Sequence, residues 1–417
     1  MVFVHVNRTF IDERGGRWSA ASRSAQPTVL HYSHHSVGLG HLVRSLAVAE
    51  GLTERFRVVL CSGGPVPAGL RLPPRVEIVE LPPIGTGPDG RLASLEPGLT
   101  LEQAWDRRRA RLLSLYAQLR PVAILVELFP FGRAKFAREL VPLLESARRD
   151  APAVKVIASV RDLLVTDKRD QQGHDDLAAE RLRRYFDAVV VHADERFARL
   201  EETFRPSATP ATPVFYSGFV SSSTELRGGE VRTPPEVLVS AGGGLQGGAL
   251  LRAGAGAHSV ALAARGFRTR LVTGPFLAAD EASRLETLVG DIPGLSVERF
   301  IPDLCRAMAG AAASVSQCGY NTTLDVLRSG VPAVVVPYDE GRENEQAERA
   351  RRLARLGALK VLPSALLTPE RLAEAVLDVV DAAPPSLDLD LAGASHTAAL
   401  VSDLVGAATP VGDRRVA

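Results

Sequence analysis

A glycine and a run of small polar residues follow an apolar segment in the second half of the chain. In order they are Gly319, Tyr320, Asn321, Thr322 and Thr323, with Asp325 two positions further on. Glycine permits a close backbone approach, and a polar helix start presents N–H and hydroxyl groups that can hold phosphate oxygens. Asp325 would lie about one turn after Asn321 and Thr322 on the same face, so its carboxylate could accept two ribose hydroxyls. The alternative interpretation is a capped helix with a surface aspartate.

A second polar segment, residues 338–346, follows an apolar run that we expect to be a buried strand over 333–337. α/β folds place ligands at the carboxyl ends of parallel strands, which is where this segment would lie. Its Glu343, Asn344 and Gln346 offer donors and acceptors to sugar hydroxyls. The alternative is an exposed, charged helix start. The presence of this segment weakens the surface interpretation of Asp325.

A glycine-rich turn opens the second half of the chain. Gly242, Gly243 and Gly244 stand between an expected strand over 236–240 and an expected helix over 250–264. Such a turn can cradle phosphate at the helix start, where each dipole interaction contributes only about 0.3–1 kcal/mol, so several must act together. A tight strand-to-helix turn without a ligand explains the glycines equally well.

The first half opens with a similar pattern, in which Gly38 and Gly40 form the turn and His41 follows. An imidazole that titrates near neutrality suits a general base acting on a hydroxyl, and a helix start favours its neutral form. Alternatively, His41 hydrogen-bonds the loop or touches a diphosphate. Glu127 ends an expected strand over 122–128 and could orient His41, bind an acceptor or cap a turn.

Basic residues cluster at 107–109 and Arg111, on an expected helix over 101–119. They could contact an anionic acceptor or a membrane surface. We expect a solvated face instead, because the charge of the whole chain is balanced.

Metal ligands are not expected. Four histidines near the first turn lack a cysteine or carboxylate at ligand spacing, and one of them falls within a strand. These histidines are His31, His34, His35 and His41. The chain's three cysteines are far apart, which argues against a disulfide framework and is typical of the reducing cytosol.

The chain has 417 residues, of which 46% are hydrophobic and 23% charged, a composition typical of a globular protein with two domains. The net charge of +1 gives no global attraction to nucleic acid. No apolar run reaches the roughly 18 residues that span a bilayer, and the first residues do not resemble a signal peptide. We therefore expect a cytoplasmic protein without stable membrane insertion, although peripheral membrane contact is compatible with the sequence.

Strand and helix patterns alternate through both halves, so we expect two consecutive Rossmann-like domains with doubly wound, mostly parallel sheets. A polar, Gly- and Pro-rich stretch separates them and is a linker candidate. The expected parts are a flexible extension (1–26), a first Rossmann-like domain (27–218), the linker (219–235), a second Rossmann-like domain (236–385), and a final helix and tail (386–417) that could pack on the first domain.

These motifs resemble those of glycosyltransferase family 28, which includes the bacterial peptidoglycan N-acetylglucosaminyltransferase. The resemblance covers about residues 28–385 and is strongest in the second half. It rests on the segment 319–325, Gly330-Val-Pro332, Val336-Pro337, the segment 342–346, Tyr32-Ser-His34, the segment 38–42, Arg161-Asp162 and Thr273-Gly-Pro275.

The resemblance implies the GT-B architecture, in which two Rossmann-like domains face a cleft, with the donor on the second and the acceptor on the first. Asp325 takes the place of the family's ribose-binding acid, although Glu is usual there and Asp reaches one methylene less far. Gln346 and the cluster before it would contact the sugar. Many GT-B enzymes need no metal, so we expect no cofactor beyond the nucleotide sugar.

The expected activity is transfer of a hexose, UDP-linked and with inversion, to a hydroxyl or amine of a small or lipid-like acceptor. A nucleotide-sugar hydrolase of the same fold, in which His41 activates water, is the main alternative. A non-hydrolysing epimerase would carry further His and acidic residues around the diphosphate, which the sequence does not show. A non-enzymatic binding protein also remains open.

Overall fold

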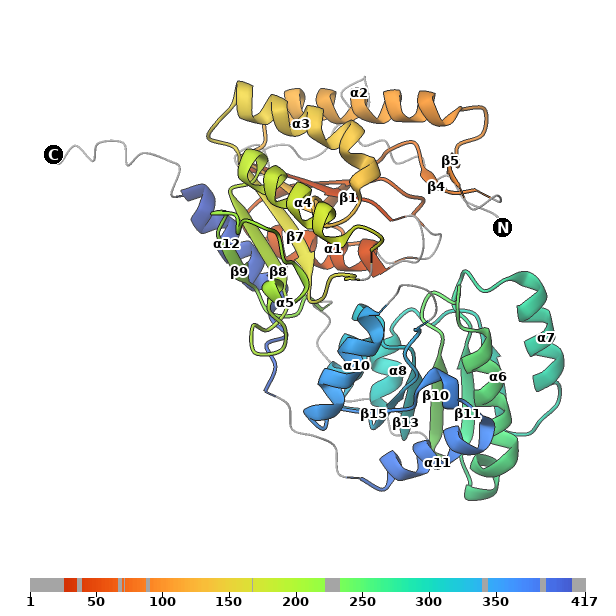
Figure 1. The fold of residues 1–417 in the computed structure, drawn as a ribbon. Coiled ribbons are helices and arrows are strands. Elements are labelled where there is room, and N and C mark those ends of the chain that lie inside the picture. Colours follow the sequence, from red (N-terminus) through yellow and green to blue (C-terminus); the bar gives the residue numbers. More distant parts are fainter. Residues whose placement is uncertain are drawn as a thin grey trace. The chain divides into compact units, whose positions relative to one another are not determined.

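The computed structural model describes residues 26–35, 40–66, 70, 72–87, 91–166, 168–221, 233–339, 344–382 and 388–406. They fall into two compact units, which Figure 1 shows. Unit 1 comprises ranges 1–162, 170–223 and 390–417, and unit 2 comprises 163–169 and 224–389. Almost all of the expected extension (1–26) and most of the expected linker (219–235) lie outside the described residues.

Unit 1 is built on a seven-stranded parallel sheet with the order β3-β2-β1-β6-β7-β8-β9. Its central strands are continuous apolar runs that are buried on both faces, as parallel sheets require. The chain order reverses on either side of β1, which makes the carboxyl ends of β1 and β6 a topological switch point. The strands are β1 (Thr28–Ser33), β2 (Arg57–Ser62), β3 (Val76–Glu80), β6 (Ala123–Glu127), β7 (Lys155–Arg161), β8 (Ala188–His192) and β9 (Val214–Tyr216), with a separate antiparallel hairpin of β4 (Ile84–Thr86) and β5 (Leu92–Ser94).

The helices of unit 1 cover both faces of this sheet. Helix α2 begins at a capping box, in which Thr100 Oγ1 accepts from the Gln103 N–H and Gln103 Oε1 accepts from the Thr100 N–H. It ends at Arg120, which has a left-handed backbone. The helices are α1 (Gly40–Leu52), α2 (Leu101–Leu119), α3 (Ala137–Asp150), α4 (Gln171–Tyr185), α5 (Leu200–Thr203) and α12 (Gly393–Gly406).

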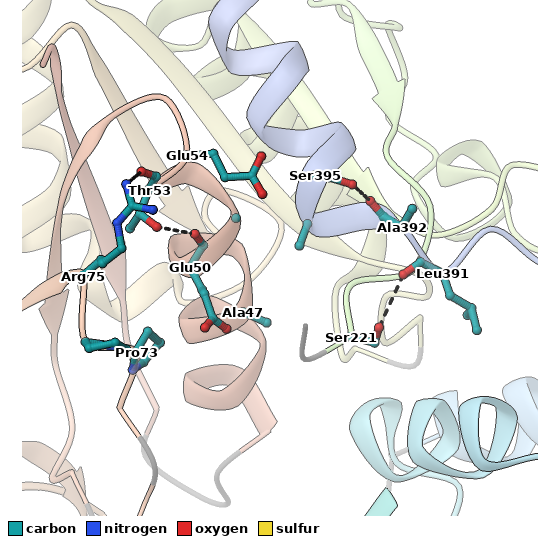
Figure 2. A pocket seen from close by; sticks show the side chains of 13 residues that line it. Ala47, Glu50, Thr53, Glu54, Pro73, Arg75, Ser221, Leu391, Ala392 and Ser395 are labelled. Atoms are coloured by element: carbon teal, nitrogen blue, oxygen red, sulfur yellow. Dashed lines mark hydrogen bonds between the residues drawn. The ribbon is translucent and has the colours of Figure 1, made fainter. Parts of the chain in front are cut away.

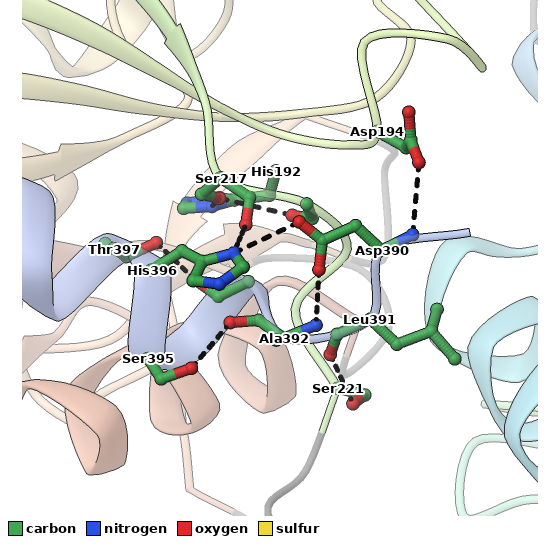
Figure 3. A network of polar contacts seen from close by, with 12 residues as sticks. His192, Asp194, Ser217, Ser221, Asp390, Leu391, Ala392, Ser395, His396 and Thr397 are labelled. Carbon is green, nitrogen blue, oxygen red and sulfur yellow. Dashed lines mark hydrogen bonds and ion pairs between the residues drawn. The ribbon is translucent and has the colours of Figure 1, made fainter. Parts of the chain in front are cut away.

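Helix α12 comes from the far end of the chain and packs against α1 (Figure 1). A network of polar contacts holds its entry segment to unit 1 (Figure 3). The Asp390 N–H donates to Asp194 Oδ2 at 3.1 Å, and the Asp390 carbonyl accepts from the Phe219 N–H at 2.7 Å. His396 Nδ1 lies 3.1 Å from both Asp390 Oδ2 and the Ser217 carbonyl oxygen. The last helix therefore belongs to unit 1.

Unit 2 contains a six-stranded parallel sheet with the order β12-β11-β10-β13-β14-β15. Here the chain order reverses on either side of β10, so the loops after β10 and β13 are neighbours. The strands are β10 (Glu236–Ser240), β11 (Arg268–Val272), β12 (Leu295–Glu298), β13 (Ala313–Ser316), β14 (Ala333–Val335) and β15 (Lys360–Val361), and the helices are α6 (Gly248–Ala257), α7 (Ala279–Val289), α8 (Leu304–Ala309), α9 (Tyr320–Ser329), α10 (Glu345–Arg355) and α11 (Pro369–Val380).

The sequence patterns place most strands within two residues but are wrong at several boundaries. The helix expected over 250–264 leaves the α conformation after Ala257 and continues as a π turn and a 3-10 turn to Arg265. The strand expected over 333–337 ends at Val335. Several polar or short helices were not expected at all, α4 among them, because an apolar periodicity signals a helix only where one face is strongly apolar.

Among the described residues, no helix is long and apolar enough to cross a membrane.

Candidate active site

His41 and Glu127 meet at the switch point of unit 1. His41 is the second residue of α1, Glu127 is the last residue of β6, and His41 Nδ1 lies 2.7 Å from Glu127 Oε1. The Glu127 side chain is 1% exposed and that of His41 is 17% exposed. Of the roles that the sequence left open for Glu127, this contact supports the orientation of His41.

The protonation states of this pair follow from their surroundings. Burial alone would raise the pKa of Glu127, but the charges and hydrogen bonds of His41, Arg44 and Arg133 hold it below its usual range. An ionised carboxylate can only accept, so Nδ1 of His41 carries the hydrogen and Nε2 has the free lone pair. Burial lowers the pKa of His41 to about 4, against the opposing effect of Glu127. His41 is therefore a neutral proton acceptor at pH 7, rather than a group that titrates near neutrality as expected.

The loop after Glu127 has an unusual backbone. Leu128 and Arg133 have φ values of 63° and 58°, in the left-handed region that residues with a side chain rarely occupy. Phe129 and Phe131 are buried on either side of Pro130 and anchor the loop in the core, where Phe131 packs edge-to-face on Phe204 at 4.9 Å. Strain of this kind persists only when the surroundings enforce it, and it clusters at functional sites.

The two glycines predicted beside His41 have different outcomes. Gly38 lies outside the described residues. Gly40 is the first residue of α1 and is exposed, directly before His41.

The basic cluster of α2 corrects one expectation. Arg107, Arg109 and Arg111 are exposed as predicted, but Arg108 is fully buried. Its Nε and Nη2 donate to the two carboxylate oxygens of Glu139 on α3, at 2.7 and 2.6 Å, and the Tyr32 hydroxyl donates to the same carboxylate. A buried charge needs such a partner, and no pattern in the sequence indicated that Glu139 would supply it.

In unit 2, the glycine-rich turn closely approaches its neighbours. Gly242 and Gly244 have φ values of +59° and +91°, and a Cβ on Gly244 would lie 2.2 Å from the Thr273 carbonyl oxygen. The carbonyl of Gly243 accepts from the Phe276 N–H at 2.9 Å. These glycines are needed because the turn packs against the loop after β11.

The predicted phosphate-binding helix start is α9. Its N-cap is Gly319, which provides no side-chain cap, and a Cβ there would meet nothing within 4 Å. A Cβ on Gly242 would lie 3.6 Å from Thr322 Oγ1, so the glycine turn and this helix start converge. Open space beside an N-cap without a side chain lets an anion approach the first turn of the helix.

The other predicted residues of α9 differ in exposure. Asn321 and Thr322 are half-buried, whereas Tyr320 is buried beneath the Arg349 guanidinium, 5.9 Å from its ring centre. Thr323 is buried and its hydroxyl lies 3.4 Å from Cys318 Sγ. The hydroxyl of Thr322, not that of Thr323, is therefore placed for a ligand.

Asp325 lies on the second turn of α9 and is half-buried. Burial raises its pKa to about 7, with the Arg328 charge acting against this shift and Asp303 adding to it. Hydroxyl donors from a ligand would stabilise the ionised form of this carboxyl group and so oppose the effect of burial on its pKa.

The second polar segment is partly described. Glu343 lies outside the described residues. Asn344 precedes α10 and its Nδ2 donates to Thr166 Oγ1 at 2.9 Å. Oε1 of Gln346 accepts from the N–H groups of Cys318 and Tyr338 at 3.1 and 3.2 Å, which ties the loops after β13 and β14 together and turns one side of the amide inward.

Arg349 is a residue of this region that the sequence interpretation missed. It is 1% exposed and its Nη1 donates to the Cys318 carbonyl at 2.7 Å. A lone arginine inside a charged helix gives no signal that it is buried.

One hollow of unit 1 lies away from these residues. It holds about 320 Å³ between the second half of α1, the Pro73–Arg75 turn and the start of α12 (Figure 2). None of the predicted site residues lines it. Among the described residues, no group of three or more His, Cys, Asp or Glu side chains could hold a metal ion.

A comparison with protein families matches residues 243–395 to the glycosyltransferase family 28 C-terminal domain. This match covers less than half of the chain. The matched segment contains the start of α9, Asp325 and Gln346.

Curated relatives of the family 28 domain agree with this assignment. The UDP-N-acetylglucosamine–N-acetylmuramyl-(pentapeptide) pyrophosphoryl-undecaprenol N-acetylglucosamine transferase of Mesorhizobium japonicum is 31% identical over 208 residues, which are 48% of this chain and 54% of that protein. The protein of the same name from Rhizobium etli is 29% identical over 36% of this chain and 41% of its own length. The chain thus matches only about half the length of these relatives.

Solved structures extend the likeness beyond the family 28 domain to the fold of the whole chain. MurG of Acinetobacter baumannii aligns with a TM-score of 0.53 and 18% identity over 90% of this chain and 99% of its own. The calicheamicin glycosyltransferase aligns with a TM-score of 0.55 and 18% identity, over 92% of this chain and 95% of its own. Medicago truncatula UGT71G1, solved with UDP-glucose, aligns with a TM-score of 0.57 and 14% identity, over 91% of this chain and 99% of its own. The predicted fold is confirmed: the chain has two parallel-sheet α/β domains of the GT-B type.

Proposed function

We propose that this chain transfers a hexose from a UDP-linked sugar to a hydroxyl or amine of a small or lipid-like acceptor, with inversion. The observation that carries this proposal is the convergence of the Gly242 turn with the start of α9, which has no side-chain cap and lies within the segment that matches the family 28 domain. A helix start beside a glycine turn that permits a close backbone approach suits a diphosphate. Glycosyltransferase relatives named for UDP-N-acetylglucosamine, and a fold neighbour solved with UDP-glucose, support a UDP-linked donor.

The donor would lie along α9, in the order of its parts. The diphosphate would sit at the N–H groups of residues 320–322 and at the glycine turn, with the Thr322 hydroxyl beside it. Asp325, one turn later, would accept the ribose hydroxyls. The Nε2 group of Gln346, together with Asn344 and Glu343, would contact the sugar.

The chemistry would require a base and a stabilised leaving group. Nε2 of His41 would take the proton of the acceptor hydroxyl as its oxygen attacks the anomeric carbon, while Glu127 stabilises the imidazolium that forms. The bond from the anomeric carbon to the diphosphate breaks, and the N–H groups of the helix start and glycine turn stabilise the departing negative charge. A single displacement inverts the configuration at the anomeric carbon.

The acceptor would be bound by unit 1, as in the GT-B enzymes that the chain resembles. The curated relatives are named for a pyrophosphoryl-undecaprenol acceptor, which supports a lipid-like carrier here. A carrier of this kind would bring the protein to the cytoplasmic face of a membrane as a peripheral partner. No metal ion or other cofactor enters this proposal.

A thermal-shift panel of nucleotide sugars tests the donor site. Ligand stabilisation follows the logarithm of ligand concentration over Kd, so a binding donor at about 100 Kd adds roughly 2.7 kcal/mol to the unfolding free energy. We expect one UDP-sugar to raise Tm in the wild type and not in Asp325→Ala. Asp291→Ala, an exposed aspartate of the same unit, is the matched control. If no nucleotide sugar shifts Tm in the wild type, the proposal fails.

Hydrolysis of the nucleotide sugar is the second candidate, because the His41–Glu127 pair can accept a proton from water as readily as from an alcohol. Release of free sugar without acceptor, at a rate that added acceptors do not exceed, would favour this activity.

A further inference from the structure

Arg44 contacts the same carboxylate oxygen as His41. Its Nη2 donates to Glu127 Oε1 and lies 3.3 Å from His41 Nδ1. His41 and Arg44 are three positions apart on α1, so one helix face presents both donors to Glu127 at the end of β6. The side chains of Arg44 and Glu127 are 2% and 1% exposed, so water does not screen the pair.

From this geometry we propose that Arg44 is a positioning residue that fixes the Glu127 carboxylate and thereby holds His41 with Nδ1–H toward Glu127 and Nε2 free. The inference rests on the proposed role of His41 as the base. Arg44 itself need not touch the acceptor or the donor.

The physical reason is that a histidine–carboxylate contact without a further partner lets the carboxylate change in two ways. The carboxylate can take a proton, after which it can donate to Nδ1 and force the hydrogen onto Nε2. It can also rotate, because the second oxygen, Oε2, is buried without a hydrogen-bond partner among the described residues. A buried guanidinium on Oε1 opposes both changes, since it stabilises the ionised form and occupies the shared oxygen.

Arg44 also has an electrostatic effect on the base. Its charge lowers the pKa of His41 and that of Glu127, in addition to the larger effects of burial and of their mutual contact. Removal of the charge should therefore move the pKa of His41 upward from about 4, toward its ordinary value of 6.5.

NMR of the ligand-free protein with 15N-labelled histidine tests this inference without any substrate. The signals of His41 are assigned by their loss in His41→Gln. In the wild type we expect a single neutral tautomer with hydrogen on Nδ1. In Arg44→Met we expect a mixture of tautomers and a higher pKa of His41, whereas Arg44→Lys, which keeps the charge, should lie closer to the wild type. Arg107→Met, an exposed arginine of α2, is the control for loss of one positive charge.

A second background shows whether Arg44 acts through Glu127. In Glu127→Gln the tautomer preference should already be weakened, and adding Arg44→Met should change it no further. The inference is overturned if Arg44→Met leaves both the tautomer and the pKa of His41 unchanged, or if it alters the tautomer equally with and without Glu127. Far-UV circular dichroism confirms that each variant is folded. A failed donor panel with these NMR results intact would reject the proposed function and leave the positioning role standing.

Discussion

At the scale of single residues, Asp325 combines a proposed role in donor binding with a raised pKa. Burial is the largest cause of its raised pKa of about 7, so the ligand-free fold holds a proton there between the ordinary value of 3.8 and about 7. The unfolded chain releases that proton at lower pH. Asp325 therefore lowers the stability of the free protein as pH rises through this window.

Donor binding should have the opposite dependence. Ribose hydroxyls that donate to the carboxylate favour its ionised form, so binding expels the proton. We expect donor affinity to rise by up to about tenfold per pH unit below pH 7 and to level off above it. Calorimetric titration between pH 5.5 and 8.5 measures this slope. Asp325→Asn should bind more weakly and lose the slope, and an equal slope in that variant would contradict the assignment.

The sequence offered the orientation of His41 as one of three roles for Glu127 but could not choose among them. They are 86 positions apart, and only the order of the sheet, with β6 beside β1, brings them into contact. The low pKa of His41 was equally out of reach, because it depends on burial by other elements. The helix start at 319–323 was easier to predict, because the local sequence of that segment alone indicates it.

At the scale of elements, the glycine turn after β10 lies beside the start of α9. Gly244 is held against the loop after β11, while Gly266 has a similar φ of +82° but open space around it. Alanine substitutions at Gly244 and Gly266 therefore distinguish the effect of a steric clash from that of backbone strain. The same comparison measures how far the donor site depends on the shape of the turn.

We therefore expect Gly244→Ala and Gly266→Ala to differ. Each introduces left-handed backbone strain of roughly 1–2 kcal/mol. Only the Cβ at position 244 would meet the Thr273 carbonyl, at 2.2 Å, and displace the turn. Gly266→Ala should lower Tm slightly and keep the shift produced by the nucleotide sugar, whereas Gly244→Ala should lose it. A donor-induced shift of wild-type size in Gly244→Ala would show that the turn does not hold the donor.

The packing of α2 against its neighbours also explains why the prediction for Arg108 was wrong. Helix α2 was found from its periodicity, but Arg108 was expected in solvent because charge runs are usually exposed. Its burial depends on Glu139 of α3 and Tyr32 of β1, which converge on it from distant parts of the sequence. The periodicity of one helix shows its apolar face but not which polar partners meet it there.

At the scale of the whole molecule, each unit has its own hydrophobic core. One core draws only on residues 237–376 of unit 2. Another, in unit 1, joins the early strands and α1 to Val220, Ala398 and Val401, so the last helix completes a core that begins almost four hundred residues earlier in the sequence. The contacts of Asp390 with Asp194 and Phe219 fix the entry to that helix (Figure 3).

Separate cores predict that a lesion in α12 weakens unit 1 alone. Ala398 is fully buried against α1, and Ala398→Asp would place an unpaired charge there at a cost of several kcal/mol. Ser395→Asp adds the same charge on the exposed side of the helix and is the control. Urea unfolding followed by fluorescence of Trp105, with Trp18 replaced by Phe, reports on unit 1, since Trp105 is buried there.

The expected result has two parts. Ala398→Asp should move the Trp105 transition to much lower urea. The unfolding transition of unit 2, followed by circular dichroism with the donor present, should keep its midpoint, because the core of unit 2 loses no contact. Ser395→Asp should leave both transitions in place. If Ala398→Asp shifts both transitions together, the two units unfold as one, and the stability of the donor site then depends on the last helix. In that case a substitution in α12 would weaken nucleotide-sugar binding without contacting the ligand.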